Sequence, residues 1–284
     1  MQVKSRLAKF VVHIILLAGS VLFLFPLLWM ISTSLKPIEE TMKMPPQWIP
    51  TSFQFQNYWR AITYQSDKLG YIPFLRYTIN TMHVATLAVV GTVISNALVA
   101  YGFARLKWPG RDAFFAVTLA TMMVPFPVIM VPIYVVFRHL GWIGSFKPLW
   151  VPAWFGSAFN IFLLRQFFLT IPKELSDAAR VDGCSEFGIF SRIVLPLSKP
   201  ALAVVALFSF LYHWNDFLGP LVYLTDQRSF TLSLGLQFYQ SQHGGTEWNL
   251  LMAASTIVVL PIILLFFFTQ RTFIQGITVT GLKG

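Results

Sequence analysis

Six long runs of apolar residues dominate the chain, and shorter polar segments separate them. They lie near residues 11–32, 77–103, 113–137, 149–169, 200–222 and 250–270. Each run has about the 20 residues that an α-helix needs to cross the hydrocarbon core of a bilayer. Because a backbone in lipid must satisfy its own hydrogen bonds, the pattern predicts an all-α integral membrane protein with six transmembrane helices.

The composition excludes a soluble domain. Of the 284 residues, 56% are hydrophobic and only 11% are charged, whereas soluble domains average about 25% charged residues. The net charge of +10 is scattered between the apolar runs. A nucleic-acid site needs a clustered basic patch, so we expect membrane lipid and no nucleic acid as a partner.

Cysteine and histidine usage predicts no metal site. Cys184 is the single cysteine, which excludes an intrachain disulfide and a cysteine-based metal centre. The five histidines show no metal-ligand spacing.

The basic residues of the short loops predict the orientation. Six spans place both termini on one side, and cytoplasmic loops carry an excess of Lys and Arg. With cytoplasmic termini, the inner segments hold Lys4, Arg6, Lys9, Arg105, Lys107, Arg111, Lys173, Arg180, Arg192, Lys199, Arg271 and Lys283. The first apolar run is too long for a signal peptide. We therefore predict a multi-pass membrane protein with both termini in the cytoplasm.

The third apolar run and the loop 33–76 carry further local signals. Pro125, Pro127 and Pro132 cluster in the third run, and proline removes a backbone hydrogen bond and kinks a helix. A fixed bend is favoured there over a hinge. The long loop 33–76 combines prolines with aromatic residues, which is typical of a lid lying on the outer membrane surface.

The long polar loop 172–196 is patterned as a helix that stops at a glycine. Pro172 suits a first turn, where a missing N–H costs nothing. Glu174 and Asp177 follow early in the helix, where the helix dipole favours negative charge. Gly183 then supplies a residue that adopts the left-handed conformation of a helix end.

A second short helix is expected in the same loop. Ser185 can cap it, and Pro196 is expected to end it before the fifth apolar run. Small residues at Ala178, Ala179 and Gly183 permit the close approach of another protein's backbone. Two short helices at a fixed angle along the inner membrane face are thus predicted, and an ordinary interfacial hairpin is the alternative.

The loop also matches a known motif. The spacing Asp177-Ala-Ala-x3-Gly183-x9-Ile193-x-Leu195-Pro196 resembles the "EAA" loop of binding-protein-dependent ABC importer permeases. In that family the loop docks on a cytoplasmic ATPase subunit. The resemblance implies a coupling role for Glu174, Asp177, Ala178, Ala179, Gly183, Ile193, Leu195 and Pro196. Asp177 stands where the family usually has Glu, so the charge is kept and the reach is shorter.

Three other segments, residues 161–168, 214–221 and 246–249, are similar to the carbohydrate-uptake branch. The tail, residues 270–276 and 281–284, is similar to the second permease of maltose-type systems. This resemblance implies the type I ABC importer architecture with cytoplasmic coupling helices, in the cytoplasmic (inner) membrane of a prokaryote. It implies a second permease as heterodimer partner, two ATPase subunits, an extracytoplasmic solute-binding protein and a sugar substrate.

No ATPase chemistry is expected in this chain. The Lys4-Ser5 pair is not preceded by the glycines of a phosphate-binding loop. We therefore predict that the chain is not an enzyme and holds no cofactor, and that the partner ATPase subunits bind ATP and Mg.

The domain organisation follows from these assignments. Residues 1–76 form the N-terminal cytoplasmic segment, the first transmembrane helix and the long outer loop. Residues 77–271 form the permease core with the coupling loop 172–196, and 272–284 form a cytoplasmic tail. In the maltose-type group the tail reaches into the ATPase dimer, which is the role expected for 277–284; disorder is the alternative.

Polar residues near the fifth run are candidates for a sugar path. Sugars need hydrogen bonds and an apolar stacking face. The candidates are Asn160, His213, Trp214, Asn215 and Asp216. Alternatively, Asp216 caps a helix break near Gly219 and Pro220 or pairs with the partner permease, and both alternatives stay open. Gly244 and Gly245 form the tip of an outer loop that, by the resemblance, contacts the binding protein.

Other functions are weighed against a sugar importer. A glycerol-phosphate or other small-solute ABC importer is one alternative, although the fifth run offers no Arg or Lys to a phosphate ester. An ion-driven secondary transporter predicts buried charges near the midplane and inverted repeats. A membrane-embedded enzyme needs converging catalytic groups. Neither pattern is evident.

Overall fold

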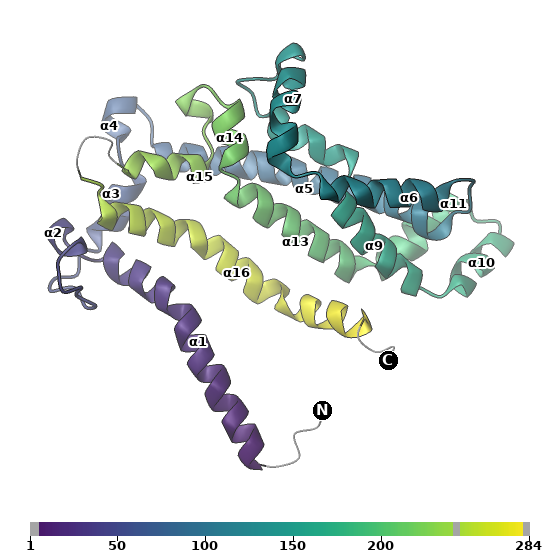
Figure 1. Ribbon diagram of the computed structural model, residues 1–284, viewed down its shortest axis with the longest axis horizontal. Coiled ribbons are helices and arrows are strands. Elements are labelled where there is room, and N and C mark those ends of the chain that lie inside the picture. Colours follow the sequence, from purple (N-terminus) through teal and green to yellow (C-terminus); the bar gives the residue numbers. More distant parts are fainter. Residues whose placement is uncertain (1–5, 241–244, 281–284) are drawn as a thin grey trace. The chain divides into compact units, whose positions relative to one another are not determined.

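Helices build the whole of the described chain. The computed structural model describes residues 6–240 and 245–280, and every regular element in these ranges is helical (Figure 1). The all-α fold class is thereby confirmed. The chain divides into two compact units, of which the first comprises Met1–Leu75 and Leu236–Pro261 and the second Arg76–Gly235 and Ile262–Gly284.

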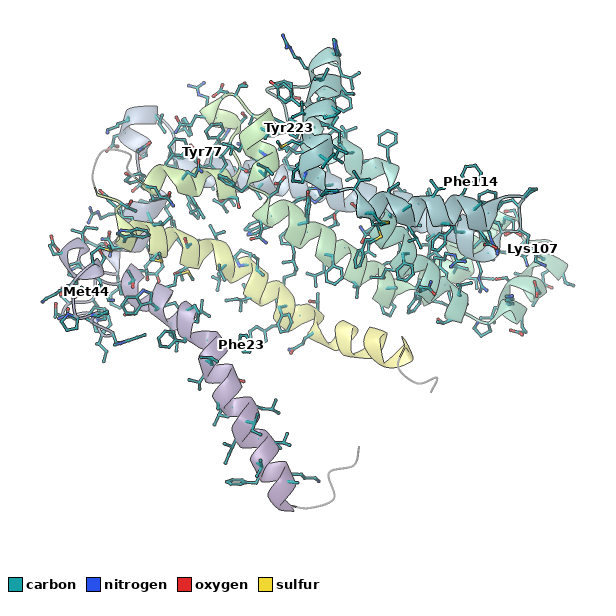
Figure 2. All side chains as sticks on the ribbon, viewed as in Figure 1. Phe23, Met44, Tyr77, Lys107, Phe114 and Tyr223 are labelled. Atoms are coloured by element: carbon teal, nitrogen blue, oxygen red, sulfur yellow. The ribbon has the colours of Figure 1, made fainter. Side chains whose placement is uncertain are left out.

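Three of the six apolar runs form unbroken helices, as predicted. They are α1 (Arg6–Ser34), α5 (Pro73–Arg105) and α16 (Trp248–Thr280). A helix of 33 residues, such as α5 or α16, is about 50 Å long, which exceeds the ~30 Å of a hydrocarbon core. The most apolar stretch of α1 is not buried within the chain, and Phe23 is 86% exposed (Figure 2). This surface suits lipid or another apolar partner.

The third run is not one helix, contrary to the prediction. It forms α6 (Arg111–Ala120), η1 (Thr121–Met123) and α7 (Phe126–His139), and the two halves are bent by 100°. The break falls at Val124, which is extended because it precedes Pro125. The proline cluster therefore produces the predicted bend, and it is sharp enough to divide the run.

The fourth run is also interrupted. α8 (Lys147–Trp150) and η2 (Val151–Phe155) precede α9 (Ala158–Thr170). Gly156 between them has a φ of +83°, which favours glycine. The amide of Ser157 donates to Oδ1 of Asn96 on α5 over 2.7 Å. This bond holds the start of α9 in place.

In the fifth run α13 (Lys199–Asn215) ends at the extended residue Asp216, and α14 (Leu218–Tyr223) follows. The part of the chain that the structure describes has three helices apolar and long enough to cross a membrane, or up to six spans if each bent pair counts as one. The number of six spans therefore stays a prediction.

In the first unit the long loop forms the short helices α2 (Ile38–Thr41), α3 (Gln56–Ile62) and α4 (Ser66–Leu69), and η5 (Leu236–Tyr239) precedes α16. Ala61 of α3 and Tyr239 of η5 pack in one buried cluster with the start of α16. Asn57 on α3 is buried and donates to the carbonyls of Ser34 and Lys36 over 2.9 and 3.0 Å. The loop 33–76 is therefore tied to the end of α1 by buried backbone contacts.

The second unit is organised around α5. Small residues Ala97, Ala100 and Ala104 let α9 and α13 approach it closely, and together they form one buried cluster. A second cluster joins α5 to α7, α8 and α14. Near that cluster, η4 (Gln227–Ser229) and α15 (Leu232–Gly235) follow α14. Asn80 on α5 donates to the carbonyls of Arg228 and Phe230, each over 2.9 Å.

Between α9 and α13 the chain forms four short helical elements. They are α10 (Lys173–Val181), α11 (Glu186–Ile189), η3 (Phe190–Val194) and α12 (Leu195–Leu197). In Figure 1, α10 lies near the end of the second unit where α6 begins. We call residues 172–196 the elbow.

Candidate functional site

The first arm of the elbow ends as its sequence predicts. Gly183 has a φ of +80° and donates its N–H to the Arg180 carbonyl over 3.0 Å. The next N–H, of Cys184, donates to the carbonyl of Ala179 over 2.9 Å. This paired bonding is the Schellman motif, which satisfies the last carbonyls of a helix. Pro172 is extended and immediately precedes α10, so it lies one position before the predicted first turn.

The second arm begins at the predicted cap. Oγ of Ser185 accepts the N–H of Gly188 over 3.2 Å, which starts α11. The prediction that Pro196 ends this helix is wrong. A π-helical turn, η3, follows α11, and Pro196 lies inside α12, so that the helical path runs on to Ser198. The wider turn puts the N–H of Leu195 on the carbonyl of Phe190, which relieves the crowding that proline causes in an α-helix.

Arg180 connects the two arms. Its Nη1 donates to Oδ1 of Asp177 and its Nε donates to Oε1 of Glu186, each over 2.7 Å. The other oxygen of Glu186 accepts the hydroxyl of Tyr101 on α5 over 2.7 Å. The bond from Arg180 and that from Tyr101 hold the pKa of Glu186 below its ordinary value. We call these four side chains the clamp, because they join α10, α11 and α5.

The sequence analysis missed three members of the clamp. Arg180 lies three residues after Asp177 on one helix, and this spacing is a local signal for an ion pair. Tyr101, by contrast, is 85 residues before Glu186. Their contact depends on packing, so that no spacing rule would have found it.

The inner side of the elbow packs on the core of the second unit. Ala179 is 8% exposed and Ser176 is 3% exposed, and Ala179 joins the cluster formed with α5, α9 and α13. Ile193 and Leu195 are half-buried against the same cluster. Ala179 therefore faces its own chain, which corrects the expectation that it admits the backbone of another protein.

The outer side of the elbow is exposed and partly apolar. Glu174, Asp177, Ala178, Gly183 and Pro196 are exposed. Leu175 is 44% exposed, Val181 88% and Phe187 70%. Leu175, Ala178 and Val181 recur every three residues and share one side of α10. We call Leu175, Ala178 and Val181 the docking face.

A profile of the family described as "Binding-protein-dependent transport system inner membrane component" matches residues 96–279, which include the whole elbow. The chain belongs to this family. It is therefore a permease subunit of the inner membrane, from a transport system that works with a binding protein. The family resemblance of the elbow motif is thus confirmed.

Full-length relatives agree with this assignment. The arabinooligosaccharides transport system permease protein AraQ of Halalkalibacterium halodurans is 36% identical over 92% of this chain and 91% of its own length. AraQ of Bacillus subtilis is 34% identical over 93% and 92%. The sn-glycerol-3-phosphate transport system permease protein UgpE of Rhizobium meliloti is 31% identical over 98% of both chains. All three are named as permease proteins, which agrees with a subunit that is not itself an enzyme.

A solved structure shows the same fold. It is the crystal structure of a bacterial ABC transporter involved in the import of the acidic polysaccharide alginate. One of its chains superposes with a TM-score of 0.80 at 22% identity, covering 95% of this permease and 98% of that chain. The type I ABC permease architecture is therefore shared.

The residues predicted to line a sugar path differ in how exposed their side chains are. Trp214 is 3% exposed and its ring stacks on Phe210 at 5.3 Å, so its face is not offered to a ligand. His213 is half-buried and bonds the Ser209 carbonyl over 2.7 Å. Asn215 is exposed. The exposed aromatic side chain at this end of α13 is instead Tyr212, which is 65% exposed.

Asp216 has a capping role in the fold. Its Oδ1 accepts the N–H of Gly219 over 3.0 Å at the start of α14. On α9, Asn160 donates to Ser157 over 2.8 Å, and its buried Oδ1 has no hydrogen-bond partner among the described residues. This acceptor of Asn160 is enclosed within its own chain, so it is not offered to a ligand in this arrangement.

Two of the predicted segments lie partly outside the described residues. At the predicted loop tip, Gly244 lies outside the described residues, while Gly245 next to it is exposed with a φ of +114°. Within the tail 277–284, residues 281–284 are outside the described ranges, and 277–280 continue the backbone of α16.

Proposed function

We propose that this permease is the membrane subunit of a sugar importer and that its elbow transmits the work of ATP hydrolysis to the translocation path. The partner ATPase subunits would bind ATP and Mg, and a second permease would complete the path. One observation carries the proposal: the elbow is rigidly tied to the transmembrane helices on one side and presents an apolar docking face on the other.

The docking face explains how a separate subunit would hold the elbow. Exposed apolar side chains that gather on one surface mark protein–protein contacts. Burying the largely exposed Val181 contributes about 1.5–3 kcal/mol, and burying Leu175, which is 44% exposed, contributes about half of that. The exposed carboxylates of Glu174 and Asp177 lie on the same helix, and they supply charge-assisted hydrogen bonds at its rim.

The clamp and the buried cluster explain how movement would be transmitted. Force applied to α10 reaches α11 through Arg180 and reaches α5 through Glu186 and Tyr101. Ala179 and Ile189 pack in the cluster with α9 and α13. Because packed interiors deform little, the elbow would tilt these helices as a body and alternate the access of the path.

A neutral sugar is the proposed substrate class. The full-length relatives named AraQ transport arabinooligosaccharides by name. The fifth run, residues 200–222, contains no Arg or Lys that would attract a phosphate ester. Exposed Tyr212 and Asn215 offer a stacking ring and hydrogen bonds at the end of α13. The UgpE relatives make glycerol-3-phosphate the second candidate.

The loop tip and the tail are proposed to contact the other subunits. Gly244 and Gly245 would let the outer loop enter the binding protein, since glycine tolerates the positive φ seen at Gly245. Residues 277–284 would reach the ATPase dimer from the end of α16.

The docking face is tested by reconstituting the complete transporter in liposomes. Leu175→Gln with Val181→Gln should weaken co-purification of the ATPase at least tenfold, because the apolar contacts that are lost contribute about 2 kcal/mol or more in total. Ile49→Gln is the matched control, since Ile49 is 75% exposed in the loop 33–76. Normal co-purification and coupled uptake in the double variant would contradict the proposal.

The substrate class is tested separately. The ATPase rate of the reconstituted complex is measured with its binding protein and either arabinooligosaccharides or glycerol-3-phosphate. Stimulation by the oligosaccharide alone supports the sugar assignment, and stimulation by glycerol-3-phosphate alone refutes it.

A further inference from the structure

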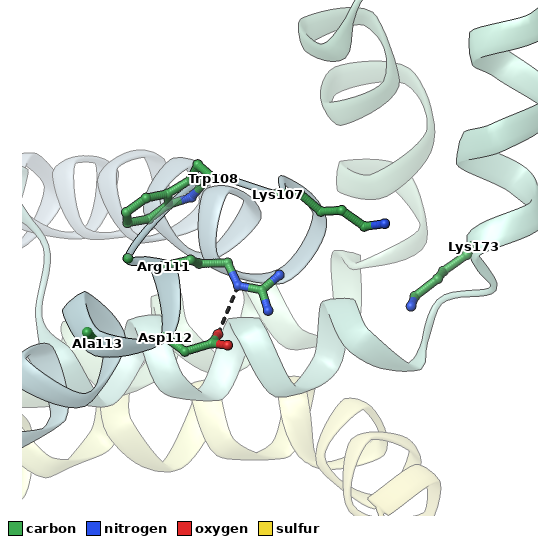
Figure 3. Close-up of a pocket in the computed structure, with 7 residues that line it drawn as sticks. Lys107, Trp108, Arg111, Asp112, Ala113 and Lys173 are labelled. Carbon is green, nitrogen blue, oxygen red and sulfur yellow. Dashed lines mark hydrogen bonds and ion pairs between the residues drawn. The ribbon is translucent and has the colours of Figure 1, made fainter.

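A basic pocket lies beside the elbow. It has a volume of 470 Å³ and is lined by Lys107, Trp108, Gly110, Arg111, Asp112, Ala113 and Lys173 (Figure 3). Lys107, Trp108 and Gly110 lie in the connection between α5 and α6, and the next three residues form the start of α6. Lys173 is the first residue of α10. The pocket therefore joins the α5–α6 connection to the beginning of the elbow.

The pocket has more positive charge than its own residues neutralise. Nε of Arg111 donates to Oδ1 of Asp112 over 2.9 Å. Lys107 and Lys173 are exposed, and neither side chain has a hydrogen bond or ion pair with the residues that the structure describes. Figure 3 shows both side chains reaching toward the space between them. An anion placed there would turn repulsion between two ammonium groups into two attractions.

The pocket also offers backbone donors. Gly110 precedes α6, a helix of 10 residues, and Arg111, Asp112 and Ala113 form its first turn and part of the pocket wall. The N–H of Arg111 already donates to the carbonyl of Trp108 over 3.4 Å. The amides of Asp112 and Ala113 are therefore the first-turn donors that remain for a phosphate. Phosphate oxygens would thus meet both ammonium groups and amide N–H groups.

An apolar surface adjoins these charges. Trp108 at the pocket is 37% exposed, and its ring lies 5.8 Å from that of Phe114. Phe114 and Val117 on α6 are 62% and 63% exposed, and Phe114 points away from the helix in Figure 2. Cationic groups, an interfacial tryptophan and then exposed apolar side chains match the head group and acyl chains of a phospholipid. An acidic protein surface would match only the charges.

We propose that this pocket binds the phosphate of an anionic phospholipid. The bound head group would bridge Lys107 of the α5–α6 connection and Lys173 of α10, so that the lipid steadies the start of the elbow. Coupling between ATP hydrolysis and transport would therefore depend on anionic lipid. The binding step rests on membership of the membrane-permease family and on the pocket, and only its effect on coupling rests on the proposed function.

The test uses the complete transporter in nanodiscs of phosphatidylcholine with or without phosphatidylglycerol. Native mass spectrometry measures the phosphatidylglycerol retained by the complex. Lys107→Gln and Lys173→Gln should each weaken retention about fivefold, because a basic residue near an anionic surface contributes about 1 kcal/mol. Lys147→Gln is the matched control, since Lys147 is an exposed lysine of α8 outside the pocket. Equal melting temperatures in phosphatidylcholine would show that the variants fold.

The other outcomes overturn the inference. Retention in the double variant equal to that of the wild type would exclude a lipid site. Binding of inorganic phosphate in the pocket, without any preference for phosphatidylglycerol, would indicate a site for a soluble anion. Loss of the ATPase subunit with unchanged lipid retention would indicate a protein contact. Lipid retention is measured without substrate. Loss of lipid binding with intact sugar uptake can therefore be distinguished from loss of sugar uptake with intact lipid binding.

Discussion

Replacing Gly183 tests whether the backbone geometry of the elbow matters. Gly183 has a φ of +80°, and a Cβ built on it would meet nothing within 4 Å. Gly183→Ala therefore causes no clash inside this chain. Its only intrinsic effect is to place a residue with a Cβ in the left-handed region, where the Schellman motif needs it.

The magnitude follows from this single effect. An L-residue in the left-handed region costs about 1–2 kcal/mol relative to glycine, which changes the population of a local conformation by a factor of about 5–30. Asparagine tolerates this region better than alanine, and a β-branched residue tolerates it worse. The defect should increase from Gly183→Asn through Gly183→Ala to Gly183→Val.

The assay is the ratio of sugar transported to ATP hydrolysed in proteoliposomes that contain the complete transporter. Hydrogen exchange of residues 173–186 measures local opening of the elbow in the same samples. Gly102→Ala is the matched control, because Gly102 lies inside α5 and its Cβ would also meet nothing within 4 Å. We expect the control to leave both measurements unchanged.

Two results would refute the reasoning. If Gly183→Asn is as damaging as Gly183→Val, the constraint is the close approach of a partner and not φ. If Gly183→Val opens the elbow by hydrogen exchange and yet leaves the transport ratio normal, a fixed elbow is not needed for coupling.

Three further predictions concern the clamp and the helix break. A double-mutant cycle of Arg180→Gln with Glu186→Gln, measured as thermal stability, should give a coupling energy of about 0.5–1 kcal/mol, since both side chains are partly exposed; no coupling would mean that the ion pair does not join the arms. The lowered pKa of Glu186 means that its carboxylate stabilises the elbow above the ordinary pKa of 4.5, and that this stability is lost as the pH falls through the lowered folded-state pKa. Hydrogen exchange of the elbow should rise below that ordinary pKa, and Glu186→Gln should abolish the dependence. Asp216→Ala should lower stability by about 0.5–2 kcal/mol through loss of the bond to the Gly219 N–H, while Asp216→Asn should retain most of it. Lost transport in a stable Asp216→Asn variant would instead assign Asp216 to the sugar path.

The local features of this permease could be predicted from neighbouring residues. The length of an apolar run decides whether α1, α5 and α16 can cross a bilayer, and these helices are present. Gly183 and Ser185 act on backbone groups within five residues. The end of one arm and the start of the next therefore follow from these two residue types alone. The sharpness of the bend at Pro125 was not predictable, because composition does not tell a kinked helix from a divided one.

The tertiary structure decided which side chains meet. Helical periodicity places Ala178 and Ala179 on different sides of α10, but only packing against α5, α9 and α13 determines that Ala179 is the buried one. The contact between Tyr101 and Glu186 spans 85 residues, and the basic pocket gathers Lys107 and Lys173 from separate segments. Such contacts arise when distant helices are brought together by burial of apolar surface, which acts without regard to sequence separation. For that reason the elbow could be located from the sequence, whereas the clamp that joins α10, α11 and α5 could be seen only in the fold.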